Sequence, residues 1–334
     1  MAENSKIAWT THTFNPWIGC TKVHEGCAHC YAEGMAKRTG KAIWGPSGTR
    51  SKTSNEYWSK PMKWARDAEN AAERPRVFCA SMADIFEDWQ GPILDHLGNE
   101  ICVCHGCGKH VNYLGDCGGS EPKCGRAPRR LVLDDLRREL FGIIDATPNL
   151  DWLLLTKRPE NVWRMLGRGP FSSRRYWPNV WLGTSISNQK TAEEFVSRLV
   201  KCGELAPVLF ISAEPLLGRI DLTRLANGGG ETYDALRAEV RTNPSHKFRT
   251  SDTAPIKQVI IGVESRGPYL GSLGDFKSEA AWIDAAESLV AQCAAAKVAC
   301  FVKQIPVNGK LSHDPNEWPE DLRVRQFPAV TTAV

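Results

Sequence analysis

The sequence contains no long apolar run and no strong excess of charge of one sign. None of its apolar stretches approaches the roughly 18 residues that a helix needs to cross a bilayer. The segment that begins at Met1 has no apolar core of the kind found in secretory signals. The 42 Lys and Arg residues nearly balance the 38 Asp and Glu residues, for a net charge of +4. We therefore expect a cytoplasmic protein with no membrane-embedded segment.

The composition also excludes disorder as the main state of the chain. Of the 334 residues, 42% are hydrophobic and 24% are charged, which is enough apolar side chain to build a buried core. This length accommodates either one large α/β barrel or two domains of ordinary size.

Short apolar runs recur along the chain, and each is followed by polar residues and then by a stretch with helical patterning. A continuous apolar run, as opposed to an alternating one, indicates a strand that is covered on both faces, as in a parallel sheet. Helices are predicted over residues 131–141 and 279–296, because the apolar residues there fall on one side. The predicted strands are residues 77–81, 152–156, 180–185, 208–212, 258–263 and 299–302, with a further strand near residues 7–14.

This repeat predicts six or seven βα units, and hence an α/β fold built as a full or partial barrel. A doubly wound open sheet is the alternative, because one sequence does not show the order of the strands. Two stretches interrupt the repeat: residues 101–129 are dense in Cys and Gly, and residues 227–255 are polar throughout. We interpret both as insertions, which assigns residues 1–100 and 130–334 to the barrel core.

Polar side chains follow the predicted strands at the points where the strands end. In βα barrels the functional site forms at this face, from residues at the carboxyl ends of the strands. One polar strand end marks only where the chain meets water, but polar residues at successive ends predict a pocket. The residues expected to line it are Ser81, Asp84, Thr156, Lys157, Arg158, Thr184, Ser185, Ser212, Glu214, Glu264, Ser265, Arg266, Lys303 and Gln304.

The chain has 12 cysteines, which is many for a protein of the reducing cytosol. Metal binding explains them better than a disulfide framework does. Three lie at Cys20, Cys27 and Cys30, and five lie between residues 102 and 124. Four more are isolated, and we expect them to be small hydrophobic residues of the core. These are Cys79, Cys202, Cys293 and Cys300.

The segment from Cys20 to Cys30 has the spacing C-x6-C-x2-C and is the most specific signal in the sequence. Three thiolates on a glycine-containing loop can bind three irons of a four-iron, four-sulfur (4Fe-4S) cluster, which leaves the fourth iron open. An open iron can bind S-adenosylmethionine through its amino and carboxylate groups and so support radical chemistry. The alternatives are a zinc site completed by His24 or His29 and, with less in its favour, a catalytic disulfide between Cys27 and Cys30.

The residues around these cysteines resemble a known family. The strings FNPWIGC at residues 14–20 and GCAHCYAE at residues 26–33 resemble the opening motif of the phage-associated three-cysteine-motif proteins. Those proteins look like a divergent branch of the radical S-adenosylmethionine (radical SAM) enzymes, although the usual radical SAM spacing is C-x3-C-x2-C. Further segments match in the same order: residues 78–84, 155–160, 181–185, 211–217, 261–264 and 301–304.

The resemblance implies a partial TIM-like (β/α)6-7 radical SAM barrel with the cluster and S-adenosylmethionine at its carboxyl-terminal mouth. It implies an enzyme in which an electron from the cluster cleaves the sulfonium to give methionine and a 5′-deoxyadenosyl radical, which abstracts hydrogen from the substrate. It also implies a low-potential electron donor such as a flavodoxin and, for a phage-encoded protein, the host cytoplasm as its location.

Roles for the candidate site residues follow from the same resemblance. Cys20, Cys27 and Cys30 bind the iron-sulfur cluster and are the catalytic cysteines. The residues assigned to the cofactor are Tyr31, Ser81, Asp84, Thr156, Ser185 and Glu214. The residues assigned to the substrate are Lys157, Glu264, Arg266 and Lys303.

The second group of cysteines predicts a structural zinc site inside the first insertion. Thiolates in a short glycine-rich segment with little apolar content are typical of a zinc-stabilised module. His105 or His110 can replace a cysteine, and Cys102 is a spare ligand. An auxiliary iron-sulfur cluster takes the same ligands and is the alternative. The expected zinc ligands are Cys104, Cys107, Cys117 and Cys124.

A basic and aromatic segment at residues 157–177 points to nucleic acid as the substrate. The segment contains several Lys and Arg residues but only one acidic residue, Glu160. Trp, Phe and Tyr residues are interleaved with the basic ones. Arginines beside stacking rings suit contact with phosphates and bases. We therefore expect a radical SAM enzyme that acts on DNA or a nucleotide-derived substrate, in base hypermodification, rearrangement or repair. The alternatives are a radical SAM enzyme for a small molecule or peptide, and a zinc-stabilised nucleic-acid-binding protein without a redox cofactor.

Overall fold

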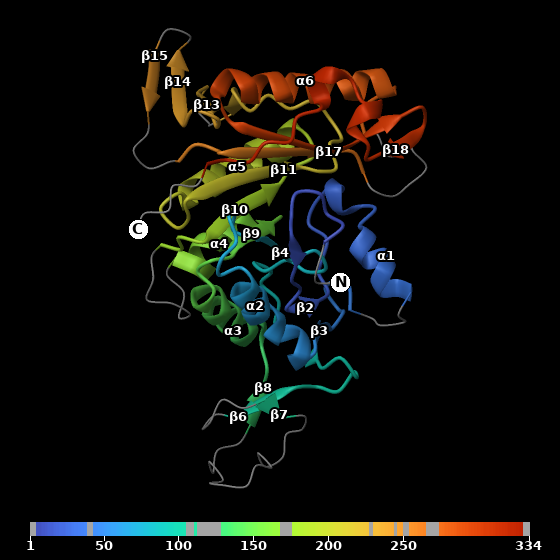
Figure 1. Ribbon diagram of the computed structural model, residues 1–334, viewed down its shortest axis with the longest axis vertical. Helices are drawn as coiled ribbons and strands as arrows, with labels where there is room; N and C mark the ends of the chain where they lie inside the picture. Colours follow the sequence, from blue (N-terminus) through green and yellow to red (C-terminus); the bar gives the residue numbers. More distant parts are fainter. Residues whose placement is uncertain are drawn as a thin grey trace.

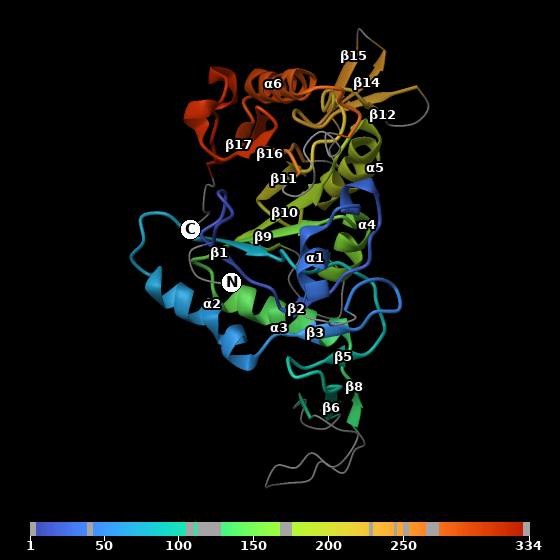
Figure 2. The same ribbon diagram turned by 90° about the vertical axis from the view of Figure 1, so that its right-hand side faces the viewer.

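The centre of the protein is one eight-stranded sheet that curls into a half-barrel (Figures 1 and 2). The computed structural model describes residues 5–38, 43–104, 110–111, 128–167, 176–226, 230–243, 246–249, 254–264 and 274–329. Neighbouring strands from β1 to β17 are parallel, and β18 pairs with β17 in the antiparallel sense. In sheet order the strands are β1 (His12–Thr13), β4 (Arg76–Cys79), β9 (Asp151–Thr156), β10 (Val180–Ser185), β11 (Val208–Ala213), β16 (Gln258–Gly262), β17 (Ala299–Val307) and β18 (Lys310–Ser312).

The order of the strands in the sheet follows their order in the chain. A doubly wound sheet reverses its strand order at a switch point, so this alternative is wrong. The predicted strands are confirmed, and the prediction for residues 180–185 matches β10 residue for residue. Among the described helices, none is long and apolar enough to span a membrane.

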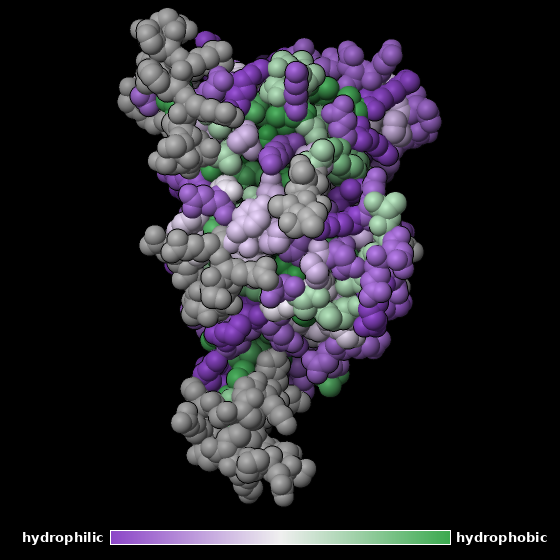
Figure 3. Space-filling view, turned by 60° about the vertical axis from the view of Figure 1, so that its left-hand side comes forward, coloured by the Kyte–Doolittle hydropathy of each residue, from purple (hydrophilic) through white to green (hydrophobic). Residues whose placement is uncertain are grey.

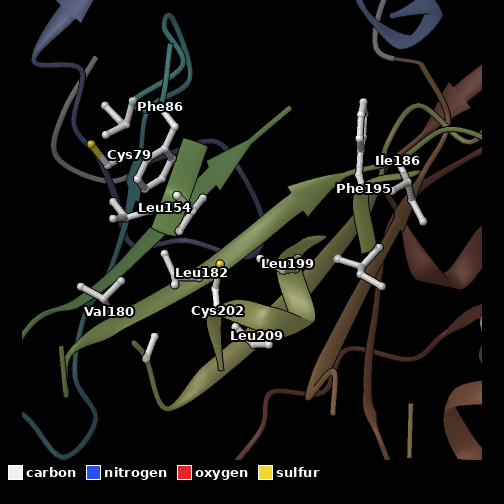
Figure 4. Packing of buried hydrophobic residues seen from close by; sticks show 14 of the residues in the cluster. Cys79, Phe86, Leu154, Val180, Leu182, Ile186, Phe195, Leu199, Cys202 and Leu209 are labelled. Atoms are coloured by element: carbon white, nitrogen blue, oxygen red, sulfur yellow. The ribbon is translucent and has the colours of Figure 1, made fainter. Parts of the chain in front are cut away.

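Helices lie on the outer face of the sheet and share one hydrophobic cluster with it. Outer strand positions such as Leu182 and Leu209 belong to this cluster together with Phe195 and Leu199 of α5, and Figure 4 shows part of the layer. The predicted core cysteines are confirmed, since all four are buried. The outer helices are α2 (Asn55–Asp67), α3 (Leu133–Ala146), α4 (Pro159–Val162), which continues as a π-helical turn (Trp163–Gly167), α5 (Gln189–Leu199) and α6 (Glu279–Ala296).

A second, separate cluster fills the inner face of the curl toward the amino ends of the strands, which we call the lower half, and we name it the floor cluster. Side chains alternate between the two faces of a strand, and the inner set here is largely aromatic. The ring of Trp9 lies 4.8 Å from that of Phe78 and 6.3 Å from that of Phe210, measured between centroids. The lower half of the curl is therefore packed core. The floor cluster consists of Trp9, Phe78, Leu153, Trp181, Val208, Phe210, Ile260 and Phe301.

Three small sheets are attached to the half-barrel. The first is β2 (Trp17–Ile18), β3 (Arg50–Lys52) and β5 (Ile93–Leu94), beside the N-terminal cysteines. The second is β6 (Cys102–Cys104), β7 (His110–Val111) and β8 (Pro128–Arg130), which projects from one end of the molecule in Figure 1. The third is β12 (Leu225–Ala226), β13 (Thr232–Asp234), β14 (Glu239–Asn243) and β15 (His246–Arg249).

The second and third sheets fall in the two stretches that interrupt the βα repeat. Of the predicted zinc ligands, Cys104 is buried in β6, whereas Cys107, Cys117 and Cys124 lie outside the described residues. Figure 3 shows one face of the molecule, on which hydrophilic side chains predominate. Large apolar side chains that are exposed come from separate segments, at Val23, Met62, Leu97 and Tyr176.

Candidate functional site

A cavity of about 380 Å³ opens at the carboxyl ends of the strands, above the floor cluster. The loop and helix that carry the three N-terminal cysteines form one wall, and the ends of the strands form the other. We call the polar part of this lining the mouth. Every described residue of the barrel with a predicted catalytic, cofactor or substrate role contributes to it, and Ser265 and Arg266 lie outside the described residues. The residues concerned are Cys20, Cys27, Cys30, Tyr31, Ser81, Asp84, Thr156, Lys157, Ser185, Glu214, Glu264 and Lys303.

The cysteine loop begins with a glycine that no other residue can replace without strain. Gly19 follows β2 with a φ of 122°, which is outside the range that L side chains ordinarily adopt. A Cβ atom there would lie 2.4 Å from the carbonyl oxygen of Ile43 and 2.8 Å from Cδ of Arg50. Gly19 therefore fixes the direction in which the chain delivers Cys20 to the cavity.

The loop then makes one 3-10 turn, η1 (Glu25–Cys27), before α1 (Tyr31–Arg38) starts directly after Cys30. His24 caps this turn: its Nδ1 accepts a hydrogen bond of 3.0 Å from the backbone N–H of Gly26. Burial, together with the charge of Lys157, lowers the pKa of His24 to about 4. The ring is therefore neutral, and the hydrogen bond from Gly26 places its proton on Nε2. Binding zinc through Nε2 would need the proton on Nδ1 and would remove this cap.

Arg158, directly after β9, connects the cysteine loop to the strand ends. Its Nη1 lies 3.6 Å from Sγ of Cys20 and 3.0 Å from Oδ2 of Asp84, and its Nη2 donates a 2.6 Å hydrogen bond to the carbonyl oxygen of Thr21. The carboxylate of Asp84 also accepts hydrogen bonds from the hydroxyl of Thr156 at 2.7 Å and the backbone N–H of Lys157 at 3.0 Å. Asp84, which follows β4, thus binds the end of β9 directly and is linked to the cysteine loop through Arg158.

A second ion pair lies behind this one, and the sequence did not reveal it. Arg50 of β3 is fully buried and binds both oxygens of Glu87, through Nε at 2.8 Å and Nη2 at 2.9 Å. Glu87 Oε1 also accepts the backbone N–H of Thr21 at 2.9 Å, and Arg50 donates to the Thr21 hydroxyl at 2.9 Å. Glu87 therefore binds the backbone of Thr21 and Arg50 binds its side chain, so the pair fixes the residue that follows Cys20.

Tyr31 and Ser81 meet on the opposite side of the loop. The hydroxyl of Tyr31 donates a 2.9 Å hydrogen bond to the carbonyl oxygen of Ser81. The buried side chain of Asn15 donates to Ser81 Oγ at 3.2 Å and accepts from the backbone N–H of Met82 at 2.8 Å. Asn15 is a further residue that the strand-end pattern missed, because it lies between two very short strands.

Four further residues of the mouth form two pairs, one between strand ends and one between a strand end and the cysteine loop. Glu214, after β11, pairs with Lys303 of β17, although the sequence assigned them to different ligands. Oε2 of Glu264, after β16, lies 3.1 Å from Nδ1 of His29. Burial raises the pKa of Glu264, and the contact with His29 partly offsets that rise. Each pair therefore brings one acidic and one basic group together at the cavity.

The thiols themselves provide a donor set for a soft metal. Cys20, Cys27 and Cys30 line the same cavity. Burial, with the nearby charges of Asp84 and Glu87, raises the pKa of Cys20 to about 12, against an opposing effect of Arg158. A bound metal cation favours the thiolate. Within the described part of the chain, no three His, Cys, Asp or Glu side chains converge closely enough to hold a single metal ion. In a 4Fe-4S cluster each thiolate binds a different iron, so its ligands need not converge in this way.

Comparison with known proteins adds one match. A family described as "Protein of unknown function (DUF5131)" matches residues 4–100 and 129–317, which is most of the chain. No curated protein and no solved structure matches it. The matched ranges leave out residues 101–128, the segment that contains β6, β7 and all five cysteines of the second group.

Proposed function

We propose that this protein, which belongs to the DUF5131 family, is a radical SAM enzyme. The observation that carries the proposal is the shared cavity: three cysteines with C-x6-C-x2-C spacing lie opposite polar strand ends, at the carboxyl face of a curled parallel sheet. In barrels of this kind this face is where functional sites are built. The sequence resemblance to the phage-associated three-cysteine-motif proteins supports the same reading.

Cys20, Cys27 and Cys30 would hold a 4Fe-4S cluster, and the donor set fits such a cluster because three thiols share one wall. When bound, the cluster supplies a single electron to the sulfonium of S-adenosylmethionine. The protein's own part is to exclude water and to orient that ligand. The apolar floor cluster below and the buried ion pairs behind the loop serve the first of these tasks.

The charges of the mouth suit the methionyl group of S-adenosylmethionine, which carries one ammonium and one carboxylate. Glu214 supplies an acceptor for the ammonium, and Ser81, Thr156 and Ser185 supply hydroxyl groups for the carboxylate and the ribose. Lys157, Glu264 and Lys303 are the proposed substrate residues. A cavity of about 380 Å³ lies within the usual range for a ligand of this size, roughly 300–1,000 Å³. Asp84 acts indirectly in this scheme, since its oxygens already bind Arg158 and Thr156.

DNA or a nucleotide-derived molecule is the substrate class that we propose, with base hypermodification, rearrangement or repair as the outcome. Support comes from the basic and aromatic segment, of which Lys157 lines the cavity and Tyr176 is exposed. Residues 168–175 of that segment lie outside the described residues. The proposal also includes a low-potential electron donor such as a flavodoxin, and a structural zinc ion on Cys104 and its three partner cysteines.

Anaerobic reconstitution with iron and sulfide tests the proposal. We expect a brown protein that releases 5′-deoxyadenosine when dithionite and S-adenosylmethionine are added, and a Cys27→Ala variant that does neither. Cys202→Ala is the matched control, because Cys202 lies in the outer core and is not part of the cavity lining. Metal analysis should find one zinc per chain beside the iron of one cluster.

The substrate class is tested in the same reaction. Deuterated DNA, nucleotides, amino acids and short peptides are supplied in turn, and deuterium in the 5′-deoxyadenosine identifies the molecule from which hydrogen was taken. Deuterium from a peptide or amino acid alone would replace the nucleic-acid assignment. A colourless protein that carries two zinc ions would overturn the radical SAM proposal and favour a zinc-stabilised nucleic-acid-binding protein.

A further inference from the structure

Among the described residues, the cationic side chain of Arg158 contacts a cavity cysteine directly, through a hydrogen bond from Nη1 to Sγ of Cys20 at 3.6 Å. We propose that Arg158 is a positioning residue that fixes Cys20 and raises the reduction potential of the cluster held by the three cysteines. This inference rests on the proposed function, because it concerns the same cluster. It adds a role for a residue to which the sequence assigned none.

The geometry ties Arg158 to both sides of Cys20. Nη1 reaches the sulfur, while Nη2 reaches the carbonyl oxygen of Thr21, the next residue in the chain, at 2.6 Å. The base of the side chain is anchored as well, since the backbone N–H of Arg158 donates to the Thr156 hydroxyl at 2.9 Å. A planar guanidinium can serve several acceptors in fixed directions, which the single ammonium group of lysine cannot do.

Charge pairing with the neighbouring carboxylates does not account for all the contacts of Arg158. Glu87 is already bound through both oxygens by Arg50, at 2.8 and 2.9 Å, and its contact with Arg158 is longer, at 3.4 Å. Asp84 takes one Nη1 contact at 3.0 Å. The other guanidinium contacts lead to the cysteine loop, so the side chain is aimed at that loop as much as at its ion-pair partner.

Charge decides the effect on the potential. Reduction adds one electron, and so one negative charge, to the cluster and its sulfur ligands. A buried cation that donates a hydrogen bond to one of those sulfurs stabilises the reduced form more than the oxidised form. The side chain of Arg158 is only 9% exposed, so water screens it little.

The test is a redox titration of the reconstituted protein, followed by electron paramagnetic resonance, in the absence of S-adenosylmethionine. In Arg158→Gln we expect at least a tenfold smaller ratio of reduced to oxidised cluster at a fixed potential, which corresponds to a midpoint about 59 mV lower for one electron. Asp84→Asn should shift the midpoint the other way, since it removes the carboxylate that shares Nη1 with Cys20. Arg198→Gln, an exposed arginine of α5 that pairs with Glu160, is the control and should leave the midpoint unchanged.

A purely structural role would lower the thermal stability of the apoprotein without moving the midpoint in opposite directions in the two variants. An Arg158→Gln protein that holds the cluster at the wild-type midpoint overturns the inference and leaves the proposed function intact. If that variant does not fold, Arg158→Met, which keeps the unbranched stem without the charge, decides: a lowered midpoint supports the inference and an unchanged one contradicts it. A wild-type protein that binds no cluster removes the proposed function itself, which is a different result.

Discussion

The lower and upper halves of the curled sheet are built from the same strands, yet they differ in almost every physical property. Below, the inner positions Trp181 and Phe210 belong to a floor cluster without a single titratable group. Two residues further along β11, Ser212 lines the cavity, and Glu214 and Lys303 form an ion pair above it. Each strand thus changes from core to site along one face.

This contrast shows how the fold separates stability from chemistry. Apolar burial is worth roughly 25 cal/mol per Å² and does not depend on pH, whereas the mouth consists of ionisable and metal-binding groups. We therefore expect substitutions in the floor to lower the free energy of unfolding, and substitutions in the mouth to alter ligand binding or pH dependence. The predictions below test that division, beginning with the largest effect.

Removing a floor ring should give the largest loss of stability. Phe210→Ala leaves a cavity in a fully buried aromatic cluster, and such truncations typically cost about 3–5 kcal/mol of unfolding free energy. Ser212→Ala on the same strand is the matched mouth variant and should change stability by less than about 1 kcal/mol. Urea unfolding monitored by circular dichroism measures both, and equal losses in the two variants would contradict the division.

Titration of the cysteine loop, which borders the mouth, should appear as a dependence of stability on pH. Because burial and the charges of Lys157 and Arg158 lower the pKa of His24 to about 4, against a partial counter-effect of Glu25, the folded state favours the neutral ring. The unfolded chain binds a proton near its ordinary pKa of 6.5. The stabilisation is therefore present above pH 6.5 and is lost as the pH falls towards 4, by about 3 kcal/mol at most.

The variant His24→Asn isolates this contribution. Asparagine keeps an oxygen that can cap η1 but has no titratable group. Unfolding of the metal-free protein between pH 7 and pH 4 should therefore lose less stability in the variant than in the wild type. Identical pH profiles would show that His24 does not carry the effect.

Close packing in the floor should make even one added methyl group unfavourable. A Cβ atom at Gly183 would lie 2.3 Å from the ring of Phe210, so Gly183→Ala should cost about 1–3 kcal/mol. Combining it with Phe210→Leu should recover part of the loss. Gly142→Ala in α3, where the new atom meets nothing within 4 Å, should instead gain about 0.5–1 kcal/mol. Thermal unfolding of the four proteins checks the signs.

The sequence predicted the half-barrel because its strands are buried on both faces, which produces continuous apolar runs such as residues 180–185. It also predicted the mouth, because strand ends converge at one face of a parallel sheet, and each described residue that was given a cofactor or substrate role lines the cavity. Thr184 and Gln304, also expected there, are buried and lie outside the lining. It missed the β2–β3–β5 sheet, whose strands have only two or three residues. The pairing of Arg50 with Glu87 joins residues 37 positions apart and leaves no local pattern.

The smallest effect that we predict concerns a single hydroxyl of the mouth. Ser185 ends β10, lines the cavity and is 2% exposed. If its hydroxyl binds S-adenosylmethionine, Ser185→Ala removes one hydrogen bond worth about 0.5–1.5 kcal/mol, which weakens binding at most about tenfold. Calorimetric titration of the reconstituted protein measures the affinity, and urea unfolding should give the wild-type midpoint. If the variant loses stability but keeps its affinity, Ser185 belongs to the packed core and not to the binding site. The core would then extend to the carboxyl end of β10.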